Sequence, residues 1–142
     1  METYVHKVQY YETDKMGIAH HSNYFRWMEE ARGWLLEKLG CPYTELEKNG
    51  IFCVVNSARC DFINSVTYGD DVEIQTEITF YHGIRISIKY RIFISGSGKL
   101  AAEGETSHSF VKSGGIARLK RDFPVFDAAL ESAVKASGLI QK

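Results

Sequence analysis

A carboxylate, a glycine and a histidine follow one another at spacings of three and four residues in one polar segment. Asp14 stands in a short break after a β-rich stretch, Gly17 permits a tight turn, and His21 lies where a long helix is expected to begin. The start of a helix offers unpaired N–H groups and the positive end of the helix dipole. Such N–H groups can polarise a carbonyl, and a facing carboxylate can attack that carbonyl or activate water. The spacing is therefore compatible with one half of an acyl-transfer site, made of the Asp14 carboxylate and the N–H groups of the helix start at His21 to Asn23.

The same residues also have a purely structural interpretation. Asp14 can accept a hydrogen bond within its own loop as an Asx turn, with Thr13 helping. His20 and His21 are adjacent, and no further ligand cluster or Cys-x-x-Cys motif follows, so we expect no metal site.

The three cysteines, Cys41, Cys53 and Cys60, are an odd number in a chain without a secretion signal, which predicts free thiols in a reducing compartment. Cys53 or Cys60 could be imagined as a nucleophile paired with His108. Both thiols fall in a β pattern, however, where a buried and inert thiol is expected.

Length and charge limit the function classes. The 142 residues predict a single domain over 1–142, and the formal charge of −1 argues against a nucleic-acid partner. No run approaches the roughly 20 apolar residues of an integral membrane segment, and the N-terminus lacks a signal peptide. We therefore expect a cytoplasmic protein.

Hydrophobic periodicity predicts one long helix among strands. Apolar residues between Tyr24 and Leu39 form one helical stripe, which Ser22 or Asn23 could cap and Gly40 would end. Period-two patterns predict strands at 3–11, 51–63, 72–80, 84–95 and 100–110, and short helices are expected at 43–48 and from Pro124 or Val125 to Lys135.

Charge patterning suggests how three of these strands pair. A hairpin that pairs residues 80 and 84 places Arg91 opposite Glu73, and one that pairs 95 and 99 places Arg91 opposite Glu103 and Lys89 opposite Glu105. This polar face is either solvated or a subunit interface. The apolar face needs cover, and only the 24–39 helix is long enough to provide it. The predicted class is α+β, a hot-dog fold with an antiparallel sheet wrapped around a long central helix.

The segment around Asp14 resembles the signature of the 4-hydroxybenzoyl-CoA thioesterase family, which includes the Tol-Pal-associated acyl-CoA thioesterases. The resemblance rests on Tyr10-x-x-Thr13-Asp14-x-x-Gly17-x-x-x-His21-x-x-Tyr24, followed by Glu29-Glu30-Ala31-Arg32. It continues through Asp61-Phe62, the run 68–74 and the run 102–111, so it covers about residues 3 to 126.

The resemblance implies hydrolysis of an acyl-CoA thioester without a cofactor. It makes Asp14 the nucleophile or general base and places the His21 backbone N–H at the thioester carbonyl. Tyr10, Gly17, Tyr24 and Glu29 become candidate substrate contacts; Glu29 matches a helix position that is acidic in enzymes acting on a phenolic acyl group.

The resemblance also implies a site at a dimer interface, and a sheet covered by one helix leads us to expect a homo-oligomer, a dimer that pairs into a homotetramer. Coenzyme A phosphates need local positive charge, which either His82 and Arg85 or the cluster of Arg118, Lys120 and Arg121 could supply.

Three alternatives remain. The substrate could be carried by an acyl-carrier protein, or the chain could be a non-catalytic acyl-CoA binding module that has lost turnover. A hydratase or dehydratase on the same fold is disfavoured, because the His-Phe-Pro motif of that group is absent.

Overall fold

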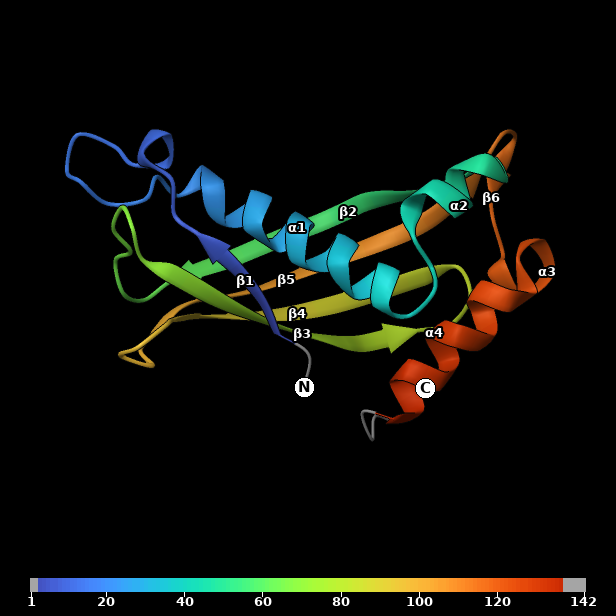
Figure 1. Ribbon diagram of the computed structural model, residues 1–142. Coiled ribbons are helices and arrows are strands. Elements are labelled where there is room, and N and C mark those ends of the chain that lie inside the picture. Colours follow the sequence, from blue (N-terminus) through green and yellow to red (C-terminus); the bar gives the residue numbers. More distant parts are fainter. Residues whose placement is uncertain (1–2, 137–142) are drawn as a thin grey trace.

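The computed structural model describes residues 3–136 (Figure 1). The ends of the predicted 1–142 domain lie outside that range, and its extent stays a prediction. No helix in the described range is long and apolar enough to cross a membrane. The elements are, in chain order, β1 (Thr3–Lys7), η1 (Tyr10–Glu12), α1 (Ser22–Lys38), α2 (Tyr43–Lys48), β2 (Ile51–Phe62), β3 (Asp71–Tyr81), β4 (Arg85–Ile94), β5 (Leu100–Lys112), β6 (Gly115–Ile116), α3 (Leu119–Asp122) and α4 (Pro124–Ala136).

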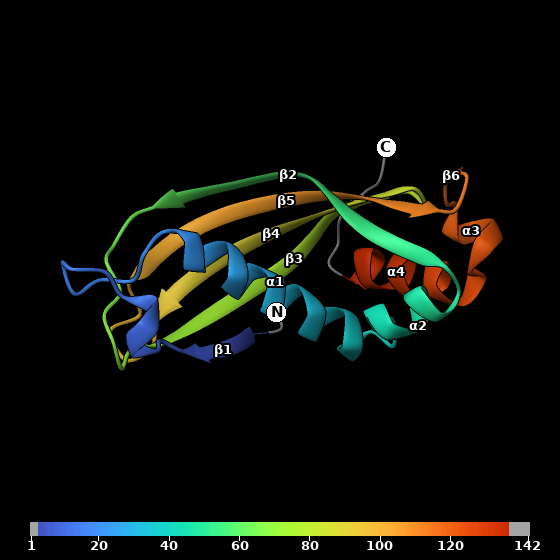
Figure 2. The same ribbon diagram turned by 90° about the horizontal axis from the view of Figure 1, so that it is seen from above.

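The strands form one antiparallel sheet in the order β1-β3-β4-β5-β2, with the short β6 added to β5. Figure 2 shows this sheet curving around α1, which lies along its concave side. β1 and β2 are the two edges, and β2 is the longer of them. The predicted hot-dog architecture is therefore confirmed.

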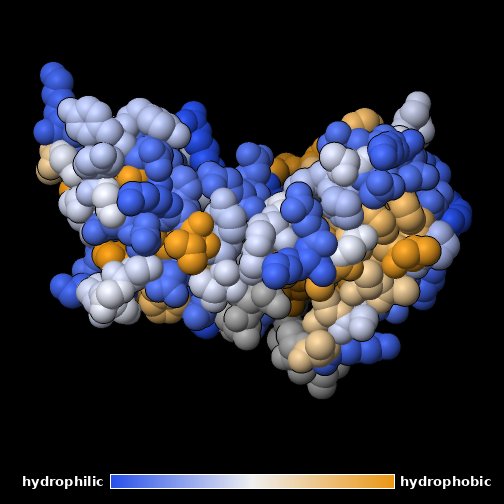
Figure 3. Space-filling model, viewed as in Figure 1, coloured by the Kyte–Doolittle hydropathy of each residue, from blue (hydrophilic) through white to orange (hydrophobic). Residues whose placement is uncertain are grey.

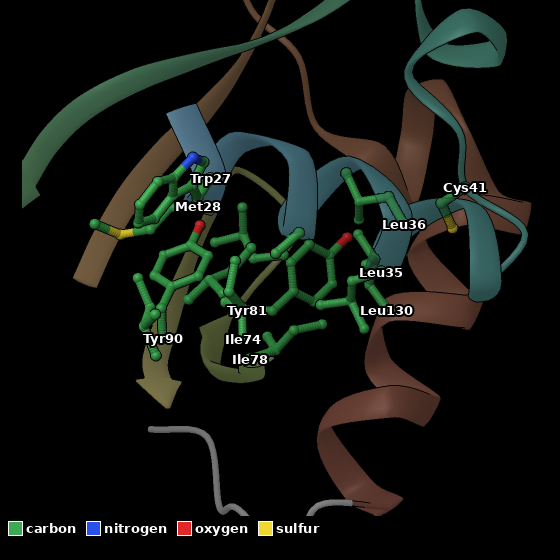
Figure 4. Close-up of a cluster of buried hydrophobic side chains, with 14 of the residues drawn as sticks. Trp27, Met28, Leu35, Leu36, Cys41, Ile74, Ile78, Tyr81, Tyr90 and Leu130 are labelled. Atoms are coloured by element: carbon green, nitrogen blue, oxygen red, sulfur yellow. The ribbon is translucent and has the colours of Figure 1, made fainter. Parts of the chain in front are cut away.

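The apolar stripe of α1 makes the centre of the core. Trp27, Met28 and Leu35 are spaced so that they share one helix face, and they point toward β3 and β4 residues such as Ile74 and Tyr90 (Figure 4). These five side chains are at most 6% exposed. Packing of α1 on the sheet fixes where the N-terminus of the helix lies, and with it the segment that precedes it.

The expectation that one helix alone covers the sheet is wrong. Phe126, Leu130 and Val134 of α4 are buried, and α4 packs against β3. Leu130 joins the cluster near Leu35 and Tyr81 in Figure 4. The sequence predicts a short helix here, but only the bend of the sheet shows that the far end of the sheet needs separate cover.

The register prediction is confirmed for one hairpin and wrong for the other. Arg91 lies opposite Glu103 in β5, with 3.7 Å between Nε and Oε1, and Lys89 lies opposite Glu105. In β3, however, Arg91 lies opposite Gln75 instead of Glu73. The difference arises at the turn, where Tyr81 lies opposite Ile86 and Phe80 does not pair with Ile84; the register shift between Ile78 and Phe80 removes only one residue of that offset.

The start of α1 also differs from the prediction. The helix begins at Ser22, its N-cap residue is His21, and no side chain caps it. Ser22 and Asn23 are helical, and their side chains bond to His20 instead. The expected strand over 3–11 ends at Lys7, because the chain turns into η1 and the Asp14 loop.

Candidate active site

Asp14, His21 and Tyr24 line one pocket beside the N-terminus of α1. Its volume is about 220 Å³. The other side of the pocket is formed by the end of β2 and the residues after it, and the full lining is Asp14, Ile18, Ala19, His21, Tyr24, Phe62, Ile63, Asn64 and Ser65. The loop before α1 and the C-terminal end of β2 therefore enclose the same space, although about fifty residues separate them in the chain.

The loop that carries Asp14 is closed by its own backbone. The Asp14 N–H donates to the Ile18 carbonyl oxygen at 2.9 Å, and the Gly17 N–H donates to the Asp14 carbonyl oxygen at 3.0 Å. Gly17 has a φ of +80°, which a residue with a Cβ adopts only at a cost. Asp14 Oδ1 accepts the Met16 N–H at 2.8 Å, so the Asx turn of the structural interpretation is present. Within residues 3–136 no group donates a hydrogen bond to its second oxygen, Oδ2.

The His21 backbone N–H stands at the positive end of α1 and is unused. Within residues 3–136 it has no hydrogen-bond acceptor, whereas the next two N–H groups are directed at His20. His21 itself is exposed and lines the pocket. A carbonyl oxygen that entered the pocket would find this free donor, which α1 orients along the axis of its dipole.

Aromatic rings form the inner wall. Tyr24 is 4% exposed and packs between the rings of Trp27 and Phe62, with centroid distances of 4.7 and 5.0 Å. Burial raises the pKa of Tyr24 to about 12, so the phenol stays neutral. The wall therefore supplies apolar contact area and an uncharged hydroxyl group.

A buried carboxylate two residues before Asp14 ties the loop to its surroundings. Glu12 is 4% exposed and accepts hydrogen bonds from the Gln9 N–H, Trp27 Nε1 and His6 Nε2, at 2.8, 2.8 and 2.9 Å. Burial opposes its charge, but the hydrogen bond from His6 and those from Gln9 and Trp27 outweigh this and lower the pKa of Glu12.

Three predicted substrate residues do not line the pocket: Tyr10, Glu29 and Gly17, which closes the turn beside Asp14. Tyr10 is 76% exposed and meets Tyr68 edge to face. Glu29 lies further along α1 and lines a larger hollow of about 550 Å³ between α1, α2 and β2. The buried Arg32 also lines that hollow; it donates to Tyr43 and Tyr90 and lies 3.8 Å from Glu29.

The two candidate basic clusters come together at the other end of the molecule. His82, Arg118, Lys120 and Arg121 line one hollow of about 450 Å³, between the β3–β4 turn and the α3–α4 region, and the carboxylates of Asp127 and Glu131 line it with them. Arg85, which follows the turn, is exposed and is not part of the lining. Figure 1 places this end far from the Asp14 loop, with the length of the sheet between them.

The sequence did not single out residues 62–65 as pocket residues. They follow a strand, and nothing in their types indicates that this strand ends beside the start of α1. Nor does the sequence indicate that Glu12 is buried, because a Glu in a polar segment is usually exposed. Among residues 3–136 no group of His, Cys, Asp and Glu side chains has an arrangement that could hold a metal ion.

Comparison with known proteins gives this geometry a family context. The model of the thioesterase-like superfamily matches residues 8–134. The chain belongs to that superfamily. It is 32% identical to a Bacillus subtilis protein named "Putative acyl-CoA thioesterase YneP", over 91% of this chain and 94% of that one.

Two further relatives agree. A solved DHNA-CoA thioesterase from Staphylococcus aureus is 33% identical, superposes with a TM-score of 0.89, and is matched over 98% of this chain and 96% of its own. The acyl-CoA thioester hydrolase YbgC of Escherichia coli O157:H7 is 28% identical over 70% of this chain and 73% of its own. The predicted family, the hot-dog fold and a thioester hydrolase as the enzyme class are confirmed at the level of the family.

Proposed function

We propose that this member of the superfamily hydrolyses an acyl-CoA thioester, with Asp14 as the nucleophile or general base and the His21 N–H as the donor to the carbonyl. The observation that carries the proposal is their shared pocket: Asp14 has one oxygen without a protein partner, and the His21 N–H has no acceptor in the described chain. A carboxylate and a free N–H group across a small cleft are what attack on a carbonyl requires.

Both routes use the same atoms. As a base, Asp14 removes a proton from water while the oxygen of that water attacks the carbonyl carbon. The carbonyl oxygen gains negative charge against the His21 N–H, the C–S bond then breaks, and the thiolate takes up the proton. As a nucleophile, Asp14 attacks directly, which expels the thiolate and forms an anhydride that water hydrolyses. The charge on the carbonyl oxygen develops at the same place in both routes, so the helix N-terminus serves either.

We also propose that the working unit is at least a dimer formed through β2. This edge strand exposes large apolar side chains, including Phe52, Val55 and Phe62, and no strand within the described residues of the chain pairs with its outer backbone groups. A long, exposed, apolar edge is a site for pairing with another strand. Antiparallel pairing of two β2 strands would place the Asp14 end of each copy beside the α3 end of the other.

That arrangement would bring the basic hollow of one copy close to the Asp14 pocket of the other. His82, Arg118 and Lys120 lie too far along the sheet to serve Asp14 of their own chain, but in the dimer they would approach the partner's pocket. Their positive charge suits the phosphates of coenzyme A. The tetramer, a cytoplasmic location, acyl-carrier protein as carrier, and substrate contacts by Tyr10, Gly17, Tyr24, Glu29 and Arg85 stay predictions.

The test is Asp14→Asn. An Asn side chain keeps an oxygen that can accept the Met16 N–H, so the Asx turn and the fold should survive, while the charge that attacks or takes the proton is lost. We expect kcat to fall by at least about 10³-fold with binding of the intact thioester retained, on a panel of short aliphatic, long aliphatic and aromatic acyl-CoA and acyl-carrier-protein substrates.

A matched control is Asp70→Asn. Asp70 holds a neighbouring turn by accepting the N–H and hydroxyl of Thr67, but it does not line the pocket. The Asp70→Asn variant should retain near-normal turnover. Wild-type turnover by Asp14→Asn would reduce Asp14 to a turn-forming residue and refute the proposal. Binding without turnover in the wild type would indicate the non-catalytic module.

A further inference from the structure

We propose that Glu12 is a positioning residue: it fixes the distance between the Asp14 carboxylate and the His21 N–H by anchoring both ends of the loop that joins them. The inference rests on the proposed function, because the two groups matter only if they act on one substrate. It is carried by the side chain and the backbone of Glu12, which bond to different parts of the site.

The side chain fixes the Asp14 end of the loop. Its two oxygens accept bonds from three elements: the His6 ring of β1, the Gln9 N–H before η1, and the Trp27 indole of α1. The residue is buried and its partners are spread around it, so the backbone at 12 can shift only if a buried carboxylate loses donors. Asp14 follows two residues later.

The backbone of the same residue fixes the His21 end. The Glu12 carbonyl oxygen accepts the His20 N–H at 2.8 Å and the Asn23 side-chain amide, also at 2.8 Å. Asn23 is buried, and its amide also reaches the His20 carbonyl oxygen. The Glu12 carbonyl oxygen thus connects the start of the loop, at residue 13, to its end, at residues 20 and 23.

The anchor is supported in turn by His6. Its Nδ1 lies 3.1 Å from Oε1 of Glu30 on α1 and its Nε2 lies 2.9 Å from Glu12, while the ring packs on Trp27 with a centroid distance of 5.1 Å. A neutral imidazole can donate to only one of two ionised carboxylates, whereas the protonated ring donates to both. Tyr4 adds a hydrogen bond to Glu30 at 2.8 Å, so the network runs from β1 to the surface of α1.

The experiment compares Glu12→Ala and Glu12→Gln with the wild type on the best acyl-CoA substrate. Misplacement of reacting groups by about 1 Å can cost roughly 10²-fold in rate. We therefore expect kcat of Glu12→Ala to fall about 10- to 100-fold with KM within about threefold, and Glu12→Gln, which keeps one acceptor oxygen, to recover part of the loss. Amide hydrogen exchange over 13–21 should speed up in both.

Thr106→Val serves as the stability control. Thr106 is buried and bonds to Tyr90 and His108 in the sheet, away from the loop. The Thr106→Val variant should have a lower thermal stability than the wild type, while its kcat stays within about twofold of the wild-type value. The inference is overturned by a Glu12→Ala kcat within twofold of the wild type, by an equal loss in Thr106→Val, or by unchanged exchange over 13–21. If the wild type cleaves no thioester of the panel, the proposed function fails, and the exchange measurement alone decides whether Glu12 holds the loop.

Discussion

Asp14 shows how one side chain can fit two interpretations at once. Oδ1 accepts the Met16 N–H and shapes the turn, while Oδ2 has no partner in the described chain and belongs to the lining of the pocket. The turn holds the carboxylate in one orientation before substrate arrives, and this reduces the reorganisation that the reaction requires. The structural interpretation of Asp14 therefore describes part of what the catalytic interpretation needs.

His108 gives a prediction on stability at the same scale. Its side chain is buried, Nε2 lies 2.8 Å from Thr106, and Nδ1 has no partner within residues 3–136. Burial, helped by the positive charge of Arg32, lowers the pKa of His108 from 6.5 to about 4. The unfolded chain therefore binds a proton below about pH 6.5, whereas the folded chain binds it only near pH 4. The free energy of unfolding falls by about 3 kcal/mol as the pH is lowered across this interval.

The measurement is urea unfolding of the wild type and His108→Gln between pH 4 and 7. Gln can place an amide nitrogen near the position of Nε2 but does not titrate, so the difference in unfolding free energy between the two proteins should shrink as the pH falls. A difference that does not change with pH would show that His108 contributes nothing to acid sensitivity.

At the scale of elements, the sequence predicted what depends on periodicity and missed what depends on contacts between distant segments. The stripe of α1 and the alternation in β3, β4 and β5 gave boundaries within two residues, because burial of one face imposes a period. The bulge after Ile78, the N-cap at His21 and the cover by α4 were missed, because each depends on neighbours that are not adjacent in the chain. Asp14 and His21 were found because a motif links them, but residues 62–65 were not.

Gly104 shows how closely α1 approaches the sheet. A Cβ at this β5 position would lie 2.7 Å from Sδ of Met28 and 2.9 Å from the backbone oxygen of Arg59 in β2. Met28 can move, but the Arg59 backbone is held in the ladder. Gly104→Ala should therefore lower the free energy of unfolding by about 1–3 kcal/mol in urea titrations.

Gly33→Ala is the matched control. Gly33 is in the middle of α1, and its added Cβ would meet only Tyr43, at an ordinary 3.7 Å. This change should raise the free energy of unfolding by up to about 1 kcal/mol, because Ala favours the helix. Equal and small effects at both positions would contradict the close approach of α1 to β5.

At the scale of the molecule, the two edges and the two ends differ in what they expose. β1 has five residues and leads straight into η1, which limits its use as a pairing edge, whereas β2 has twelve residues and carries a row of exposed apolar side chains. In Figure 3, hydrophilic side chains dominate the end with the Asp14 loop, and apolar ones gather at the end with α4. The Asp14 pocket lies at one end of the chain and the basic hollow at the other. They can form a single site only if a second copy lies antiparallel to the first, so that the pocket of one copy meets the hollow of the other.

The two edges allow a paired test of assembly. Val55 on β2 and Val5 on β1 are 54% and 55% exposed, so the same change to Lys alters equally exposed sites on opposite edges. If β2 forms the interface, Val55→Lys buries a charge between two copies, and light scattering should shift from a multiple of the 16.1 kDa chain mass toward one chain, with loss of turnover. Val5→Lys should keep the assembly and the activity of the wild type. A wild type that is monomeric at micromolar concentration, or a Val55→Lys variant that stays assembled and active, would contradict both the β2 interface and a site completed by the partner subunit.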